Sequence, residues 1–134
     1  AGHASAMDVT AIPAVIFTEP EIATTGLSEK EAQAQGYSPK TGKFPFAANG
    51  RALTTGKADG FVRVISDAES DVVLGVEIVG PQASDLIAEA TLGLEMASFT
   101  ADLGLTVHAH PTLSEGLMEA AAAVKGEAIH MLNR

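Results

Sequence analysis

The pattern of hydrophobic and polar positions in the first half of the chain predicts short strands separated by turns. Residues 11–18 (AIPAVIFT) are apolar and rich in Val, Ile and Phe, and Glu19-Pro20 closes them, which predicts a buried strand. Pro13 makes the strand begin there or places it at a sheet edge. Apolar and polar residues alternate in residues 43–52, which predicts another strand that ends in a loop at the Asn49-Gly50 turn signal.

Two further segments have the clearest strand signal in the sequence. Residues 61–65 (FVRVI) and 72–80 (VVLGVEIVG) are rich in β-branched residues, and the polar stretch SDAES lies in the interval between them. This arrangement predicts a hairpin of two well-formed strands.

Two segments have a helical pattern. Ser28 and Glu31 form a capping-box signature, which predicts a short helix that Gly36 ends. Apolar residues recur at helical spacing over residues 82–98, and Pro81 lies at a suitable first turn. We therefore predict a second, longer helix of about four turns there.

The final third of the chain is also predicted to be helical. A brief helical turn begins at Thr100, and a last helix runs from Pro111 through LSEGLMEAAAAV, whose small residues permit close approach by another backbone. Residues 106–107 leave room for a short edge strand. Because the other strands precede the two longer helices, the order predicts an α+β fold with a mainly antiparallel sheet and helices packed on one face.

Length and composition fit one globular domain. The chain has 134 residues, of which 46% are hydrophobic and 19% are charged, so residues 8–134 are expected to form a single domain. Residues 1–7 (AGHASAM) are interpreted as an expression-tag remnant, and His3 is therefore assigned no functional role. The absence of Cys excludes disulfides, thiolate zinc sites and thiol nucleophiles. A redox function would need sulfur from another source.

Charge and motifs exclude further classes of function. The net charge of -9 disfavours nucleic acid and anionic membranes as partners. No run approaches the roughly 18 apolar residues that a membrane-spanning helix needs, so we expect a soluble intracellular protein. The sequence has no G-x-G-x-x-G, P-loop or G-x-S-x-G motif. The familiar nucleotide-binding loops and the hydrolase nucleophile elbow are therefore absent from it.

One segment concentrates titratable groups at a loop-to-helix junction. Residues 108–115 read HAHPTLSE. Pro111 favours an extended His110 that is directed away from the helix, and Glu115 lies on the first helical turn, near enough to reach back. A carboxylate that accepts the N–H of one imidazole nitrogen leaves the other nitrogen free as a base. His110 and Glu115 are therefore the candidate catalytic pair.

Simpler interpretations of the same residues remain open. Glu115 and Thr112 also match a capping box, in which the carboxylate would only satisfy helix N–H groups, and His110 alone would be a structural histidine. His108 and His110 would point the same way in an extended segment, with Glu115 as a third metal ligand, although we predict no metal site. His130 has no neighbour that would give it a role, and we expect it in a frayed terminal helix.

Several segments together resemble one known family. IPAVIFTEPEIATTGLSE, KFPFAANGRA, VLGVEIVGP and above all HAHPTLSE are similar in order and spacing to the C-terminal interface domain of dihydrolipoamide dehydrogenase. The resemblance covers nearly all of the chain from Ile12 onward. This family belongs to the flavin-dependent pyridine nucleotide-disulfide oxidoreductases, whose full chains place FAD and NAD domains before this one.

The resemblance implies roles for three residues. His110 corresponds to the family's acid–base histidine, and Glu115 corresponds to the carboxylate that orients it. In the intact enzyme the histidine takes a proton from dihydrolipoamide, the thiolate attacks a redox disulfide beside the flavin of the other subunit, and electrons pass through FAD to NAD. By the same resemblance, His110 and Pro111 line the FAD side of the partner's site.

The resemblance also implies partners and a location. It implies a homodimer formed through this domain, and a parent enzyme that serves a 2-oxoacid dehydrogenase or glycine cleavage complex in the bacterial cytoplasm or the mitochondrial matrix. The isolated chain is expected to be inactive and to bind no cofactor, because it lacks cysteines and the FAD and NAD domains. The alternatives are a stand-alone binding or assembly module with this fold, and the corresponding domain of a glutathione reductase-like enzyme.

Overall fold

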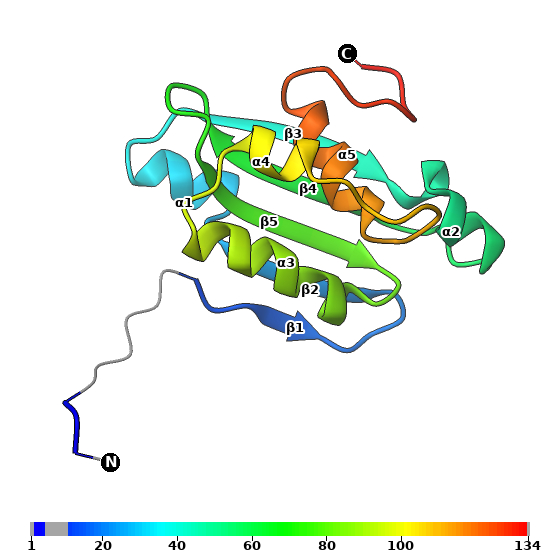
Figure 1. Ribbon diagram of the computed structural model, residues 1–134, viewed down its shortest axis with the longest axis horizontal. Coiled ribbons are helices and arrows are strands. Elements are labelled where there is room, and N and C mark those ends of the chain that lie inside the picture. Colours follow the sequence, from blue (N-terminus) through cyan, green and yellow to red (C-terminus); the bar gives the residue numbers. More distant parts are fainter. Residues whose placement is uncertain (1, 5–10, 134) are drawn as a thin grey trace.

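The centre of the structure is one antiparallel sheet. The computed structural model describes residues 2–4 and 11–133, so the tag interpretation of residues 1–7 falls mostly on residues outside the described ones. The strands are β1 (Ala14–Ile16), β2 (Glu21–Gly26), β3 (Pro39–Pro45), β4 (Phe61–Asp67) and β5 (Val73–Gly80). They form a five-stranded sheet in the order β1-β2-β5-β4-β3, and each neighbouring pair is antiparallel (Figure 1).

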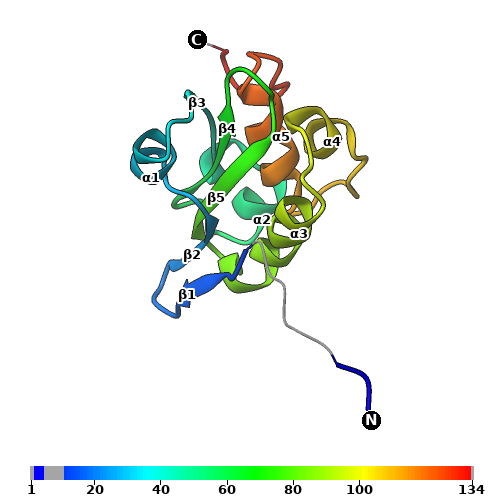
Figure 2. The same ribbon diagram turned by 90° about the vertical axis from the view of Figure 1, so that its left-hand side faces the viewer.

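Three helices cover one face of this sheet. The described part of the chain has five helices: α1 (Glu29–Ala34), α2 (Gly50–Thr54), α3 (Ala83–Glu95), α4 (Thr100–Leu105) and α5 (Glu115–Ala123). A 3-10 turn lies at Phe46–Ala48. The three helices that cover this face are α3, α4 and α5. Helix α3 packs on β2 and β5, α5 packs on β3 and β4, and α4 packs on α5. Figure 2 shows these three helices on one side of the sheet and α1 on the other. The predicted α+β fold is therefore confirmed.

The main core lies between the sheet and the three helices. Alternate residues of the central strands point into it, and the inner faces of α3 and α5 complete it. Its largest fully buried apolar side chains on the strands and the 3-10 turn are Phe44, Phe46, Val62, Val64, Val76 and Ile78. A smaller cluster of Ala32, Ile65 and Leu74 lies apart from it, where α1 packs against the sheet. No helix in the described part of the chain is long and apolar enough to cross a lipid bilayer.

The strand predictions are right for the centre of the sheet and less accurate at its edges. The predicted hairpin is confirmed, because β4 and β5 pair along their length. Residues 11–18 contain only the short strand β1, which pairs with β2, a strand whose sequence EIATTG lacks the run of large apolar residues that would have indicated it. The predicted edge strand at residues 106–107 is wrong, because these residues form an exposed loop.

The helix predictions differ from the structure at their boundaries. Residues 49–50 begin α2 instead of a loop, because the Asn49 Oδ1 accepts a hydrogen bond of 3.0 Å from the Ala52 N–H and caps the helix. Helix α3 ends three residues before the predicted boundary. The last helix begins at Glu115 and not at Pro111, and residues 127–133 form bends and irregular structure instead of the expected terminal helix.

Small residues bring α5 into backbone contact with β3, as their sequence predicted. A Cβ atom added to Gly42 would lie 2.2 Å from the carbonyl oxygen of Ala120 and 2.4 Å from the backbone nitrogen of Val124. No side chain fits between the two backbones at this point. The contact therefore sets how α5, and the acidic residues on its inner face, lie over the sheet.

This contact predicts a sharp effect of one methyl group. Gly42→Ala forces α5 away from β3 and is expected to lower the free energy of unfolding by about 1–3 kcal/mol. Gly50→Ala is the matched control, because its Cβ would meet only Pro111, at 3.8 Å, and the substitution should be neutral or slightly stabilising. Urea unfolding measures both variants. Equal stabilities of the two variants would contradict the close packing at Gly42.

Candidate functional site

The candidate catalytic residues lie where the loop after α4 enters α5. His110 is in this loop, and its side chain is 70% exposed. Glu115 is the first residue of α5, and its side chain is only 12% exposed. The Nδ1 atom of His110 lies 2.8 Å from the Oε1 atom of Glu115. The structure therefore brings the two predicted residues together, with the acid inside the fold and the imidazole outside it.

The second oxygen of Glu115 holds the helix start. Its Oε2 accepts a hydrogen bond of 2.8 Å from the Thr112 N–H. The Thr112 hydroxyl donates to the Ala109 carbonyl at 2.7 Å, so it does not complete a reciprocal capping box. Glu115 thus both satisfies a backbone N–H and contacts His110. The two roles that the sequence left as alternatives occur together, one on each oxygen.

Several opposing effects act on the Glu115 carboxyl. Burial raises its pKa, whereas the hydrogen bonds from the Thr112 N–H and from His110 lower it. The positive charges of His110 and then of His130 lower it further. The net result is a pKa of Glu115 below its ordinary value of 4.5. Glu115 is therefore a carboxylate at neutral pH.

An ionised Glu115 determines which nitrogen of His110 carries the proton. A carboxylate can only accept, so the Nδ1 of His110 must donate the hydrogen bond. The Nε2 atom of the neutral ring then keeps its lone pair, and no group among the described residues forms a hydrogen bond to it. The arrangement presents an oriented base at the surface. Chemically, it can accept a proton from a group that approaches from outside this chain.

The first histidine of the motif has a different partner. The His108 Nε2 atom lies 2.8 Å from the Oε1 atom of Glu89 on α3, and its Nδ1 lies 2.8 Å from the Thr106 carbonyl oxygen. Its side chain is only 7% exposed, in contrast to that of His110. The expectation that the two rings point the same way is therefore wrong. Among the described residues, no three His, Asp or Glu side chains gather as metal ligands.

The prediction that His130 has no partner is wrong. Its Nδ1 atom lies 2.5 Å from the Oε1 atom of Glu119, which is buried on α5. His130 and Glu119 line the same cavity as His110 and Glu115, with a volume of about 150 Å³. The sequence indicated only that Glu119, four residues after Glu115, lies on the same helix face as Glu115, and it gave no signal that His130 returns to Glu119.

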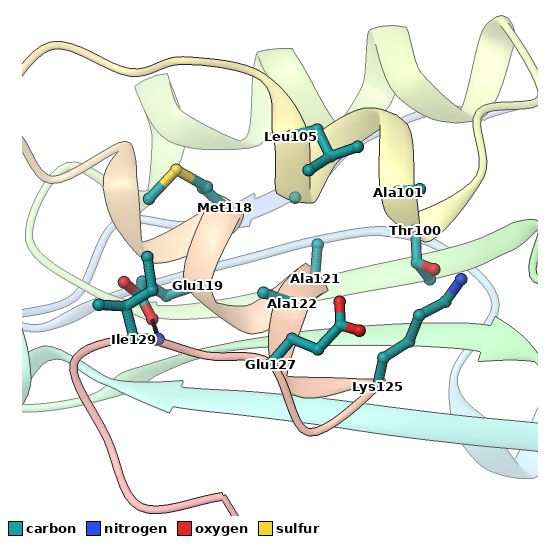
Figure 3. Close-up of a pocket in the computed structure, with 11 residues that line it drawn as sticks. Thr100, Ala101, Leu105, Met118, Glu119, Ala121, Ala122, Lys125, Glu127 and Ile129 are labelled. Atoms are coloured by element: carbon teal, nitrogen blue, oxygen red, sulfur yellow. Dashed lines mark hydrogen bonds between the residues drawn. The ribbon is translucent and has the colours of Figure 1, made fainter.

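A second, larger hollow lies between α4 and α5. Its volume is about 280 Å³, and it is lined by Leu105 and Ala101 of α4 and by Met118 of α5 (Figure 3). Ile129, from the C-terminal segment, closes one side and is 77% exposed. Further exposed apolar side chains on or after the helices are Leu92, Met96, Phe99 and Val107. Exposed apolar side chains that gather on one layer are typical of a protein interface.

Comparisons with known proteins identify the family of this chain. A sequence model of the family "Pyridine nucleotide-disulphide oxidoreductase, dimerisation domain" matches residues 12–121. The chain is 62% identical over 123 residues to the dihydrolipoyl dehydrogenase of Thermus scotoductus, covering 92% of this chain and 27% of that one. It is 55% identical over 134 residues to that of Halobacterium salinarum, covering 100% and 28%. The chain thus spans about a quarter of the length of these relatives.

Solved structures show the same fold. LpdA from Mycobacterium tuberculosis matches with a TM-score of 0.80 and 29% identity, over 89% of this chain and 26% of that one. The HOCl-induced flavoprotein disulfide reductase RclA from Escherichia coli matches with a TM-score of 0.80 and 21% identity, over 84% and 26%. The family resemblance inferred from the sequence is confirmed. Because the family match extends over most of its length, the chain belongs to the pyridine nucleotide-disulphide oxidoreductase dimerisation domains.

Proposed function

We propose that this chain is the C-terminal interface domain of a dihydrolipoyl dehydrogenase, and that His110 is the acid–base residue that it contributes. The observation that carries the proposal is the exposed imidazole of His110, held at Nδ1 by the buried, ionised Glu115. The high identity to dihydrolipoyl dehydrogenases supports this family member over a glutathione reductase-like enzyme or a stand-alone module. The longer enzyme would oxidise dihydrolipoamide with NAD.

The proposed chemistry of this chain is the movement of one proton. The Nε2 of His110 accepts the proton of a dihydrolipoamide thiol, while the bond from Nδ1 to Glu115 stabilises the resulting imidazolium. The thiolate then attacks a disulfide, and one S–S bond forms as another breaks. This chain contains no Cys, so the disulfide belongs to another part of the enzyme. Alone, the chain is therefore expected to be inactive.

FAD and NAD are the cofactors proposed for the longer enzyme. They supply electron transfer, which no side chain of this chain can provide. His110 and Pro111 are both exposed at the end of the loop before α5, which suits contact with a flavin held by another subunit. The chain has no glycine-rich phosphate-binding motif of its own. Its proposed contribution to the FAD site is therefore limited to these two side chains.

A homodimer through the helical layer is the proposed assembly. The family name describes a dimerisation domain, and exposed apolar side chains gather on α3, α4 and the segments that follow them. Burying them against a second copy would bring His110 to a site that the partner completes. A 2-oxoacid dehydrogenase or glycine cleavage complex is the proposed larger assembly for the parent enzyme.

Loss of the base is expected to slow the reaction of the longer enzyme. His110→Gln in the full-length flavoenzyme should lower dihydrolipoamide-dependent NAD reduction by about 10²-fold or more, because a general base is removed. His108→Gln is the matched control, since the His108 ring contacts Glu89 and should change turnover by less than about threefold. Steady-state kinetics with equal flavin content measure both variants. Near-normal turnover of the first variant would refute the proposed role.

Loss of the buried carboxylate is expected to make stability less dependent on pH. Because the pKa of Glu115 is lowered in the fold, its ionised form stabilises the chain above pH 4.5, and this contribution disappears as the pH falls through the lowered value. Glu115→Gln should therefore be about 1–3 kcal/mol less stable at pH 7, with a smaller difference in acid. Glu29→Gln, in the first turn of α1, is the control. Urea unfolding that shows a pH-independent difference would contradict this prediction.

A charge on α4 is expected to weaken the dimer. Leu105 is 82% exposed and lies beside the hollow between α4 and α5, so Leu105→Lys should weaken self-association by about tenfold or more. Ile16→Lys places the same charge on β1, at the far edge of the sheet, and should leave association unchanged. Sedimentation equilibrium of the 134-residue chain compares them. A monomeric parent chain would contradict the proposed interface.

A further inference from the structure

The buried acid Glu119 has a set of partners that the proposed reaction does not explain. It is 1% exposed, and it lies on α5 one helical turn after Glu115. Its Oε2 accepts from the backbone N–H groups of Ile129, at 2.8 Å, and His130, at 3.3 Å. Its Oε1 contacts the Nδ1 of His130. Three hydrogen bonds thus join one buried carboxylate to one short stretch of the C-terminal segment (residues 128–133).

The C-terminal segment is itself closed into a defined turn. The Asn133 side chain accepts from the Ala128 N–H at 3.1 Å and donates to the Ala128 carbonyl oxygen at 2.9 Å. Ala128 is buried, and Figure 3 shows the segment passing over α5 with Ile129 next to Glu119. The segment therefore reverses direction after α5 and returns along that helix. Glu119 is the residue of α5 that holds it there.

The return of the segment places a second imidazole at the candidate site. His130 and Glu119 line the cavity that also contains His110 and Glu115, so two imidazole–carboxylate pairs lie side by side. The other lining residues are uncharged, and they come from β3, the 3-10 turn and α2: Phe44, Ala48, Asn49, Gly50 and Leu53. On the opposite side of Glu119, Lys125 and Glu127 line the hollow between α4 and α5. Lys125 is paired with Asp71 at 2.9 Å.

We propose that Glu119 and His130 are positioning residues for His110: Glu119 holds the C-terminal segment on α5 so that the positive charge of His130 stabilises the carboxylate that orients the base. The link to catalysis rests on the proposed function, but the link between the two pairs does not. When His130 is protonated, the Glu115 carboxylate, one helical turn before Glu119, is stabilised by a second cation besides His110.

The electrostatics of Glu115 support this arrangement. Burial raises the pKa of Glu115, and the lowering effects include the charge of His130 as well as the contacts of His110. The ring of His130 is 52% exposed, and its Nδ1 contacts the buried Glu119. Removing the charge of His130 would destabilise the ionised form of Glu115 and leave the His110–Glu115 hydrogen bond in place.

Carbon-detected NMR titration of the Glu115 carboxyl in the 134-residue chain tests the proposal. His130→Gln removes the charge from an exposed ring, and it is expected to raise the pKa of Glu115 towards its ordinary value. His130→Lys restores a cation and should return the pKa of Glu115 most of the way. His108→Gln is the matched control and should change nothing, because His108 contacts α3. An identical Glu115 titration in His130→Gln and in the parent chain would overturn the proposal.

Amide hydrogen exchange tests the attachment of the C-terminal segment. Glu119→Gln should increase exchange at Ile129 and His130 by about tenfold or more, because hydrogen bonds to a charged acceptor are weakened. Unchanged exchange in a folded variant would contradict the role of Glu119. Neither readout depends on lipoamide turnover. If His110→Gln left turnover normal while these shifts occurred, the proposed function would fail and the coupling of the two pairs would stand.

Discussion

The contact between α5 and β3 at Gly42 is the constraint on which the rest of the site depends. Because two backbones meet there without a side chain between them, α5 lies close to the sheet and its inner face is buried. Glu115 and Glu119 lie on that face. A buried carboxylate is costly unless hydrogen bonds and opposite charges compensate for lost water. Both acids therefore need partners, and the chain provides them from the segments before and after the helix.

The two segments meet this need in the same way. Each supplies a backbone N–H to one oxygen of an acid and an imidazole to the other. The acids stay inside the fold, whereas the rings remain largely exposed. This division suits acid–base chemistry, because the carboxylate fixes the orientation of the ring while the free nitrogen remains accessible. The rigid part of the site is thus the helix, and the reactive part belongs to loops.

The proposed reaction needs groups that this chain does not contain, and the surface around His110 is consistent with a partner that supplies them. The proposed base has no thiol or disulfide to react with in this chain, which contains no Cys. Exposed apolar side chains such as Leu105 and Val107 lie on the same helical layer as the loop that carries His110. A domain that buries this layer against a partner would shield the base from bulk water at the moment of assembly, which strengthens its electrostatic interactions.

The sequence by itself determined local features of the chain. The tertiary structure decided the contacts between segments that are far apart in the sequence. The β4–β5 hairpin and the proximity of His110 to Glu115 were predictable, because each involves residues joined by a short turn or one helix start. The strand β2 was missed, because its residues become a strand by pairing with β1 and β5. The contacts of His108 with Glu89 and of His130 with Glu119 were missed for the same reason. They join segments that meet only when the chain reverses direction, and no periodicity records such loop closure.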